Sequence, residues 1–554
     1  MIRCYLIFAL TFLSSISASQ SYATMSGAFL ASRFSSSVND YKKSAIYTVS
    51  MIEKGSEQPE IYNDALLFLI ASGNFERAFS LADTMTKMKL ISPALGLILV
   101  VRKIKGGKYD DAIEIMSNFE EQFPNILKTS IQGWVHVEKG DLGAAELVFE
   151  DFKNSDLNID LSSYYKAIAY AQSGNYTEAS KIIRENKKNL ELLGASYNIF
   201  KANVANLAHS SAIATGILDN TIKETLDTLT LKQLRKKIAD GKSNSLEVFK
   251  TPKAVIAETL LLFAEADNRG ANFNLIETFY CQLAKYVSNN APRFNIRLAE
   301  SLSKVKLIDE AANSLNLVKV SDIFYAEAKV MLADLLTESA QEVKAVNELK
   351  NLLKMGINNF EVHEALGNVY RHGENYKLAN KAYSDALRLK QQSDLNDRKL
   401  WLIYFFRGIA REQMEEYQGS IADLRRSLKL MPSQPQVLNY LGYMLIERKE
   451  NLDEALDMIE LAVKNSPQSG YIIDSLAWGL YQLGRYEEAI IPMEKAISLE
   501  PEDPIVNDHF GDVLWKVGRK REAYFQWKRV LLFQPSEKLR LDIKKKLKEG
   551  LEDL

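Results

Sequence analysis

Apolar residues along this chain recur at helical spacing, in short runs that come in pairs. The clearest pair lies in residues 474–501, where Gly484 separates the two runs and Pro501 ends the second. Glycine suits a tight turn between helices, and proline lacks the N–H group that a continuing helix needs. The pattern therefore predicts a helix, a tight turn and a second helix. The apolar positions of the two runs are Leu476, Leu480 and Leu483, followed by Ile490, Met493 and Ile497.

The same hairpin recurs near the C-terminus at a step of 34 residues. Both its closing proline and the small residue of its second helix keep this step. One hairpin cannot bury its apolar face alone, so successive copies must stack to form a core. We therefore expect an all-α solenoid. The repeated positions are Pro467, Pro501 and Pro535 for the proline, and Ala455, Ala489 and Ala523 for the small residue.

An earlier series of hairpins is expected over residues 24–184. Turn glycines and the alanines that follow them recur there at steps of 33 or 34 residues, and a degenerate first repeat surrounds Ala45. The pattern predicts an N-terminal array over this range. The glycines are Gly73, Gly107, Gly140 and Gly174, and the alanines are Ala78, Ala112, Ala145 and Ala179.

The repeat register is lost over residues 185–253 and returns afterwards. That stretch stays helix-prone but has no turn glycine and alanine at the repeat offsets, so we expect an irregular helical connector between two arrays. A C-terminal array is expected over residues 254–537, with a longer hairpin where QQSDLNDRK is inserted. Residues 538–554 are expected to form a capping helix whose lysines face water. Its apolar side would carry Leu539, Ile543, Leu547 and Leu551.

The three C-terminal copies resemble the tetratricopeptide repeat (TPR), a 34-residue helical hairpin. Counted along that unit, position 8 is small, position 20 is alanine and position 32 is proline in every copy. The resemblance implies a right-handed superhelical solenoid with a ligand-binding groove along the first helices of its repeats. Position 8 is occupied by Gly442, Ala477 and Gly511, and one extra residue near Glu450 shifts the later positions of the first copy by one.

In this family the groove is lined by positions 2, 5, 9, 12 and 13 of each first helix. In the last four repeats these positions imply a groove of aromatic and acidic side chains, which suits an apolar or basic peptide segment. The family's clamp for a terminal carboxylate is absent, because position 5 holds no lysine. Alternatively, several of these rings pack between repeats. The implied partner-binding residues are Phe405, Ile409, Asn439, Tyr443, Asp474, Trp478, Tyr481, Asp508, Asp512 and Trp515.

The first 23 residues have the pattern of a secretory signal peptide. Arg3 precedes an apolar run at 5–13, and Ser21-Tyr22-Ala23 offers a cleavage site, with a cut after Ala18 as the alternative. The run is too short to span a bilayer comfortably, and no later segment is long and apolar enough. We therefore expect an exported, periplasmic protein with no transmembrane segment once the signal is removed.

Composition and charge change this picture little. Charged residues make up 25% of the chain, hydrophobic residues 47%, and the formal net charge is −2, which gives no reason to expect a nucleic-acid partner. Removal of the signal would leave Cys281 as the only cysteine, so no internal disulfide is expected. Its apolar surroundings predict a buried thiol.

Candidate catalytic chemistry is sparse. The five histidines are scattered over separate repeats, and the motifs of zinc proteases, redox dithiols and serine hydrolases are absent. Residues 241–243 resemble the end of a phosphate-binding loop, but Lys236 stands where that loop needs glycine. Asp508, His509 and Asp512 form the best cluster; the simpler interpretation is acids favoured by a helix dipole. We expect no enzyme, no cofactor and no metal.

The segments DSLAWGLYQLGRYEEA and NDHFGDVLWKVGRKREAYFQW are similar to secreted or lipid-anchored proteobacterial repeat proteins. That similarity implies a non-catalytic protein-binding scaffold of the bacterial cell envelope, holding a protein or peptide partner of unknown identity. Two alternatives stay open. One is a periplasmic adaptor in polysaccharide synthesis or export, and the other is an enzyme of cell-wall or sugar chemistry.

Overall fold

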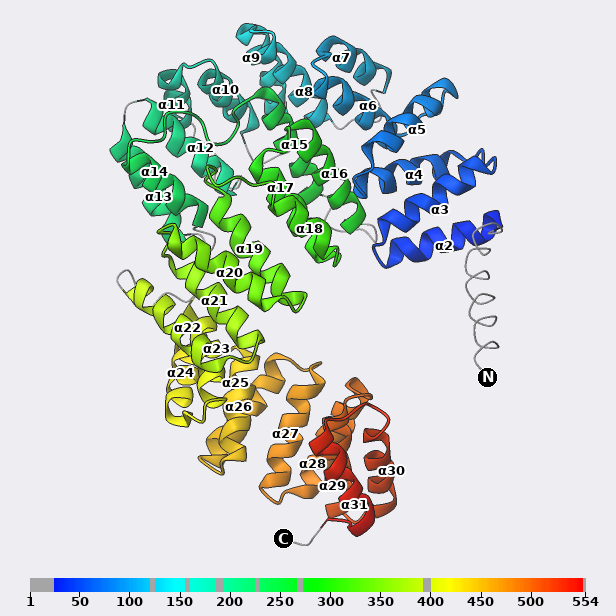
Figure 1. The fold of residues 1–554 in the computed structure, drawn as a ribbon, viewed down its shortest axis with the longest axis vertical. Helices are drawn as coiled ribbons and strands as arrows, with labels where there is room; N and C mark the ends of the chain where they lie inside the picture. Colours follow the sequence, from blue (N-terminus) through cyan, green and yellow to red (C-terminus); the bar gives the residue numbers. More distant parts are fainter. Residues whose placement is uncertain are drawn as a thin grey trace, which may run out of the picture. The chain divides into compact units, whose positions relative to one another are not determined.

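Helices dominate the structure, a computed structural model in which no described residue lies in a strand (Figure 1). The predicted signal segment at 1–23 and most of the insert at 391–399 lie outside the described residues. The all-α solenoid of helical hairpins expected from the sequence is confirmed. The described residues are 24–119, 125–154, 160–185, 194–208, 210–224, 229–266, 273–391 and 400–551.

Two compact units divide the chain between Glu348 and Leu349, within helix α20. This division lies beyond the connector expected at 185–253, whose described residues contribute three helices, α12 to α14, to the first unit. The repeat boundaries at 184, 254 and 537 stay predictions of the repeat pattern.

The first unit contains the helices up to α19 and the start of α20. Consecutive helices pair as hairpins, and one short 3₁₀ helix, η2 (Asp151–Asn154), follows α9. The bounds are α2 (Met25–Ser37), α3 (Tyr41–Glu53), α4 (Pro59–Ala71), α5 (Phe75–Lys87), α6 (Pro93–Lys105), α7 (Tyr109–Asn118), α8 (Asn125–Glu138), α9 (Leu142–Glu150), α10 (Leu161–Gln172), α11 (Tyr176–Glu185), α12 (Gly194–Leu207), α13 (Ser211–Glu224), α14 (Leu229–Ala239), α15 (Pro252–Ala266), α16 (Phe273–Val287), α17 (Pro292–Lys304), α18 (Ile308–Leu315), α19 (Tyr325–Glu338) and α20 (Glu342–Lys354).

The second unit is a row of five hairpins followed by one more helix. Its bounds are α21 (Phe360–His372), α22 (Tyr376–Gln391), α23 (Trp401–Glu412), α24 (Tyr417–Leu430), α25 (Pro435–Glu447), α26 (Leu452–Asn465), α27 (Gly470–Gln482), α28 (Tyr486–Leu499), α29 (Pro504–Lys516), α30 (Lys520–Val530) and α31 (Glu537–Glu549).

In most hairpins whose turn is described, the turn holds a residue in the left-handed backbone region. A Cβ atom makes this conformation costly, so glycine suits the position. The predicted turn glycines occupy it, with φ between +72° and +84° at Gly73, Gly107, Gly140, Gly174 and Gly484. Other hairpins place a residue with a side chain at the same point, with positive φ at Lys306, Ala340, Glu374, Glu415 and Lys449.

Small residues let the two helices of a hairpin approach closely, as the repeat pattern predicts. A Cβ added to Gly442 would lie 2.8 Å from the carbonyl oxygen of Ala455, and one added to Gly511 would lie 2.3 Å from the Trp527 indole nitrogen. The alanines at position 20 are fully buried in the same contact: Ala455, Ala489 and Ala523.

The first helices of the N-terminal hairpins are covered by a second layer from the same chain. Helix α16 packs against α4 and α6, and α15 packs against α8, so this pair lies along the inner side of the first hairpins (Figure 1). Every residue from 94 to 101 in α6 is buried. A helix that is apolar all round must be covered on every side. The inner face of these hairpins is therefore filled by the chain itself.

Specific contacts hold α16 in this place. The Gln282 side-chain amide donates to the Ala71 carbonyl oxygen at 3.3 Å. The Tyr286 ring stacks on the Phe75 ring, with 4.6 Å between centroids. Contacts between residues about 200 positions apart are not those of a simple solenoid, in which each repeat touches only its neighbours.

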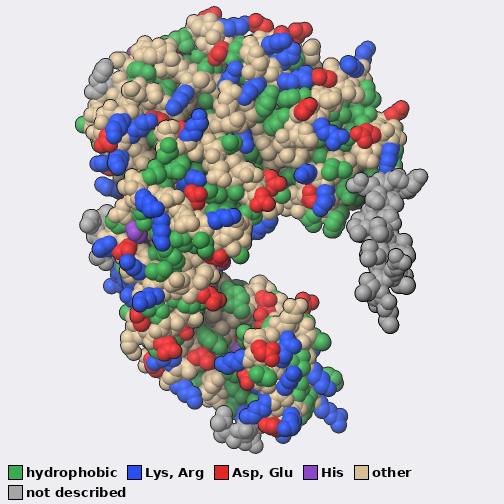
Figure 2. All heavy atoms as spheres, in the orientation of Figure 1, with side chains coloured by type: hydrophobic (Ala, Val, Ile, Leu, Met, Phe, Trp, Pro, Cys, Tyr) green, Lys and Arg blue, Asp and Glu red, His purple; other side chains and the backbone are tan. Residues whose placement is uncertain are grey.

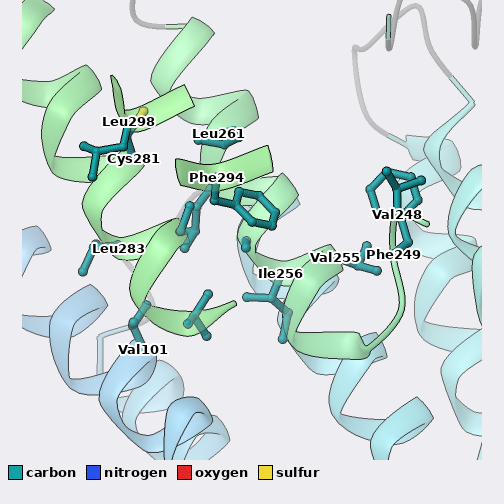
Figure 3. Close-up of a cluster of buried hydrophobic side chains, with 14 of the residues drawn as sticks. Val101, Val248, Phe249, Val255, Ile256, Leu261, Cys281, Leu283, Phe294 and Leu298 are labelled. Atoms are coloured by element: carbon teal, nitrogen blue, oxygen red, sulfur yellow. The ribbon is translucent and has the colours of Figure 1, made fainter. Parts of the chain in front are cut away.

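Helix α15 is fixed by a buried hydroxyl group and an apolar cluster. The Thr259 hydroxyl lies 2.8 Å from both the Ser130 and the Tyr165 hydroxyls, so three helices share one hydrogen-bonded group. In Figure 3, Val101 of α6 lies below Leu283 of α16, within the cluster that joins the two layers. A satisfied polar group inside an apolar interface favours one fixed packing.

Replacing Gly442 by alanine should destabilise α25 and α26 although alanine is the better helix former. Alanine in a helix gains about 1 kcal/mol over glycine, but the Cβ would meet backbone at 2.8 Å, and overpacking costs roughly 1–3 kcal/mol. At Gly479 a Cβ would come within 2.7 Å of the end of the Ile446 side chain and into ordinary contact with Leu456 at 3.6 Å, with no backbone atom in the way, so Gly479→Ala should be neutral or stabilising. Hydrogen exchange of α25 to α28 measures both, and equal protection in the two variants would contradict the close approach.

The thiol of Cys281 should be unreactive in the folded protein, because it is 1% exposed and burial raises its pKa to about 12. Labelling with a thiol reagent then reports the opening of α16. Tyr286→Ala should speed labelling about tenfold, since a stacked ring pair contributes on the order of 1 kcal/mol beyond burial. Tyr524→Ala, an aromatic deletion in the second unit, is the control. Fast labelling of the wild type would show that the inner face is open.

Candidate functional site

The ten predicted groove residues lie on the first helices of four consecutive hairpins in the second unit. The structure brings them into one row of helices but not into one cavity. They are Phe405 and Ile409 on α23; Asn439 and Tyr443 on α25; Asp474, Trp478 and Tyr481 on α27; and Asp508, Asp512 and Trp515 on α29.

A cavity of about 690 Å³ opens among helices α23, α24, α25, α27 and α29. Three of the predicted residues, Asn439, Tyr443 and Asp474, line it. Phe405 and Ile409 do not; the Phe405 ring packs edge-on against Tyr440, with 5.8 Å between centroids. We call the lined cavity the acidic pocket, because its walls carry the carboxylates described below.

The sequence analysis missed several lining residues, and four of them shape the mouth and the charge of the pocket. Tyr471 and Ile505 stand at the mouth of the acidic pocket, each 53% exposed, and Glu412 and Glu447 form its acidic walls. Counting along the repeat places Tyr471 and Ile505 at position 2, Glu412 at position 12 and Glu447 at position 13. Following every groove position through each repeat would therefore have found them.

Tyrosines and carboxylates alternate around the acidic pocket. The Tyr440 hydroxyl donates to the Glu412 carboxylate at 3.1 Å. Burial, followed by the nearby Glu412, raises the pKa of Tyr440. Burial also raises the pKa of Tyr443, with Glu447 and Asp474 adding to the effect. These phenols therefore stay neutral hydrogen-bond donors beside negative groups.

Trp478 lies in a stack of rings rather than free in a groove. Its ring is nearly parallel to those of Tyr481 and His509, with centroids 4.8 and 4.0 Å away, and its Nε1 donates to Glu447 at 2.8 Å. His509 Nδ1 lies 2.9 Å from an Asp474 oxygen. Burial opposes protonation of His509, but Asp474 outweighs it and raises the pKa of the imidazole.

Asp508 and Asp512 are occupied by the C-terminal helix of the same chain. Lys546 of α31 lies 2.5 Å from Asp508 and 2.7 Å from Asp512. Asp512 also accepts from the Trp527 indole at 3.0 Å. Burial by itself would lower the pKa of the Lys546 amine. The two carboxylates outweigh burial, so the pKa is raised. In the last repeat, positions 5 and 9 therefore form an ion-paired group with Lys546 and do not line a free groove.

Two sequence expectations are corrected here. The dipole interpretation of Asp508 and Asp512 is wrong, because Asp503 caps α29 by accepting from two backbone N–H groups, and neither acid lies in the first turn. The expectation that the lysines of α31 face water fails for Lys546, which is half-buried against acids that only the folded chain brings near.

Trp515 also lies under the end of the chain. Its ring packs against Trp527 at 5.4 Å and Tyr524 at 5.8 Å. A Cβ on Gly550 would come within 2.3 Å of the Trp515 ring, so the backbone after α31 rests directly on it. A ring covered in this way contributes packing at the end of the unit.

The described residues offer little else for chemistry. None of them forms a group of three or more His, Cys, Asp or Glu side chains placed to hold a metal ion. No helix among the described residues has the length and apolar character to cross a membrane.

Comparisons with known proteins agree with the geometry of the second unit. A family model described as "Tetratricopeptide repeat" matches residues 407–470, and another with the same description matches residues 475–503. The second unit therefore contains tetratricopeptide repeats. The matched residues include the hairpins that form most of the acidic pocket, and a search of curated proteins found no match.

The solved structures that are similar to this chain are distant. A chain of the crystal structure of the APC/C hetero-tetramer Cut9–Hcn1 is 14% identical to this chain, with a TM-score of 0.40. The match covers 98% of this chain and 98% of that chain. Yeast Tom70 has 14% identity and a TM-score of 0.34, covering 81% of this chain and 93% of that one. YrrB, "a TPR protein with an unusual peptide-binding site", has 16% identity and a TM-score of 0.28, covering 36% and 97%. Values this low say nothing of this chain's partners.

Replacing Asp512 by asparagine should change how stability depends on pH. Burial, with the neighbouring Asp508, raises the pKa of this carboxyl from 3.8 to about 6. A raised pKa in the folded state means that protonation favours folding, so the contribution is complete below about pH 4 and is lost as pH rises through 6. Asparagine does not titrate.

The free energy of unfolding of the wild type minus that of Asp512→Asn should therefore fall between pH 4 and pH 7. Urea unfolding followed by tryptophan fluorescence measures it at each pH. A difference that stays constant over this range would show that Asp512 keeps its charge throughout.

Proposed function

We propose that this TPR protein is a non-catalytic scaffold of the bacterial cell envelope that holds a partner protein in the acidic pocket of its second unit. TPR proteins bind protein or peptide partners, and repeat arrays present extended concave surfaces for this purpose. The partner would lie along α23, α25, α27 and α29, with its side chains entering the pocket.

The exposed side chains at the mouth of the acidic pocket carry this proposal. Tyr471 and Ile505 remain 53% exposed on first helices whose neighbouring residues are mostly buried. Large aromatic and aliphatic side chains beside a concave site are the groups that supply most binding energy when a partner desolvates them. Their exposure has no role in packing the hairpins, so it favours a binding role.

The first unit offers a weaker alternative for partner binding. The inner face of its N-terminal hairpins is already covered by α15 and α16. An external segment could reach that face only by displacing helices that are fixed by the Thr259 hydroxyl group and by the ring stack of Tyr286. This supports the second unit as the place where the partner binds.

A protein partner also suits the surface charge. On the face that Figure 2 shows, basic and acidic side chains are interspersed over each unit. Nucleic acids bind instead to extended basic surfaces. The envelope location is supported by Arg3, the apolar run at 5–13 and Ser21-Tyr22-Ala23. A periplasmic adaptor in polysaccharide synthesis or export would use the same pocket and differ in its partner.

A photo-reactive benzoylphenylalanine at position 471, in the full chain expressed in its host, tests the proposal. Irradiation of intact cells should give one defined adduct in the envelope fraction, whose TPR chain begins at Thr24 or at Ser19. The matched control is position 491, because Ile491 is 77% exposed on α28, away from the pocket. No adduct from 471, or the same adduct from both positions, would overturn the pocket. An adduct chain that begins at Met1 would overturn the export.

A further inference from the structure

The acidic pocket carries carboxylates whose charge no described basic residue neutralises. The Glu412 carboxylate accepts from the Tyr440 hydroxyl and from the Gln413 amide. The Glu447 carboxylate accepts from the Trp478 indole. All three donors are neutral, so none of them offsets the charge of the two carboxylates at the walls of the cavity.

The two basic residues that line the acidic pocket are already engaged elsewhere. Arg448 lies 2.7 Å from Glu450 and stacks over the Tyr417 ring at 4.1 Å. His509 is held by Asp474 at 2.9 Å. Neither group is paired with Glu412 or Glu447, so the pocket keeps an excess of negative charge beside its tyrosine rings.

The last repeat shows what satisfies such acids in this row of helices. There the covering helix α31 places the Lys546 amine between Asp508 and Asp512, at 2.5 and 2.7 Å. The indole of Trp527 lies beside the same amine, with its ring centre 6.0 Å from Nζ. A lysine between two carboxylates and next to an aromatic ring is therefore the arrangement that the chain itself uses where the row is covered.

We propose that the acidic pocket binds a lysine or arginine side chain that protrudes from the partner segment. This inference rests on the proposed function, and it adds the chemistry of the ligand. The cation would lie between Glu412 and Glu447, where charge-assisted hydrogen bonds are available, and against the faces of Tyr443 and Tyr471, which attract a positive charge. The partner is thus a basic segment, in keeping with the groove of acids and rings.

Amino-acid amides provide a direct probe of the pocket. Saturation-transfer NMR on the full chain at low salt, with N-acetyl methylamides of lysine, arginine and glutamine in one mixture, measures which side chain binds. Lysine and arginine should receive saturation and glutamine should not. In the double variant Glu412→Gln, Glu447→Gln the lysine and arginine signals should fall at least about fivefold, as expected for losing two partly exposed charge contacts. The substitutions are isosteric, so the helices should fold as before.

The control carries the same change in charge outside the pocket. Glu487→Gln with Glu502→Gln removes two exposed acids and should leave the signals unchanged. Equal signals from all three amides, or an unchanged response in the Glu412 and Glu447 variant, would overturn the inference. The crosslink from position 471 distinguishes a failure of the proposed partner site from a failure of the proposed ligand chemistry. An adduct with no cation preference would refute the ligand chemistry alone, whereas no adduct would refute the pocket as the partner site.

Discussion

The first helix of each hairpin has an inner face that its own hairpin cannot cover. How these inner faces are covered determines the organisation of this protein. Stacking of neighbouring hairpins buries the sides of these helices but leaves their inner surface. In the first unit the chain returns and covers that surface with α15 and α16. In the second unit α31 covers only the last repeat, so the acidic pocket stays open before it.

This difference in covering is the basis for proposing that the second unit, and not the first, binds the partner. The inner layer of the first unit packs through a mostly apolar core and is fixed by a shared hydroxyl group, which suits permanent packing. The open face of the second unit instead combines tyrosines, carboxylates and exposed side chains at its mouth. Polar groups beside aromatic rings are not typical of a hydrophobic core. They are typical of a surface that is solvated in the free protein and desolvated when a partner binds.

Electrostatics follows the same division. Acids at the end of the row are buried, and Lys546 offsets their charge from a distant point of the chain. Asp474 is matched by His509 from the next repeat. Glu412 and Glu447 are matched only by neutral donors among the described residues. The carboxylates along this one row of helices therefore differ in their partners. Some pair with a lysine, one pairs with a histidine, and two have no cation beside them among the described residues.

The sequence by itself determined the repeats. Turn glycines such as Gly73 and Gly484, the small Gly442 and the alanine at Ala489 are local requirements of a backbone turn or a close helix contact, so their spacing is visible in one dimension. It also pointed to the row of helices that lines the acidic pocket, because groove positions follow from the repeat. Where Glu374 or Glu415 takes the turn position, that signal weakens.

Only the tertiary structure decided which of those positions are open. That α16 lies on α4, and that Lys546 enters between Asp508 and Asp512, depends on contacts between segments far apart in the chain. Repeat spacing reflects the contacts between neighbouring hairpins. It carries no information about a helix from a distant part of the chain that covers those hairpins. The uninterrupted apolar stretch at 94–101 was a local trace of that cover, because a helix face turned to water would have needed polar residues.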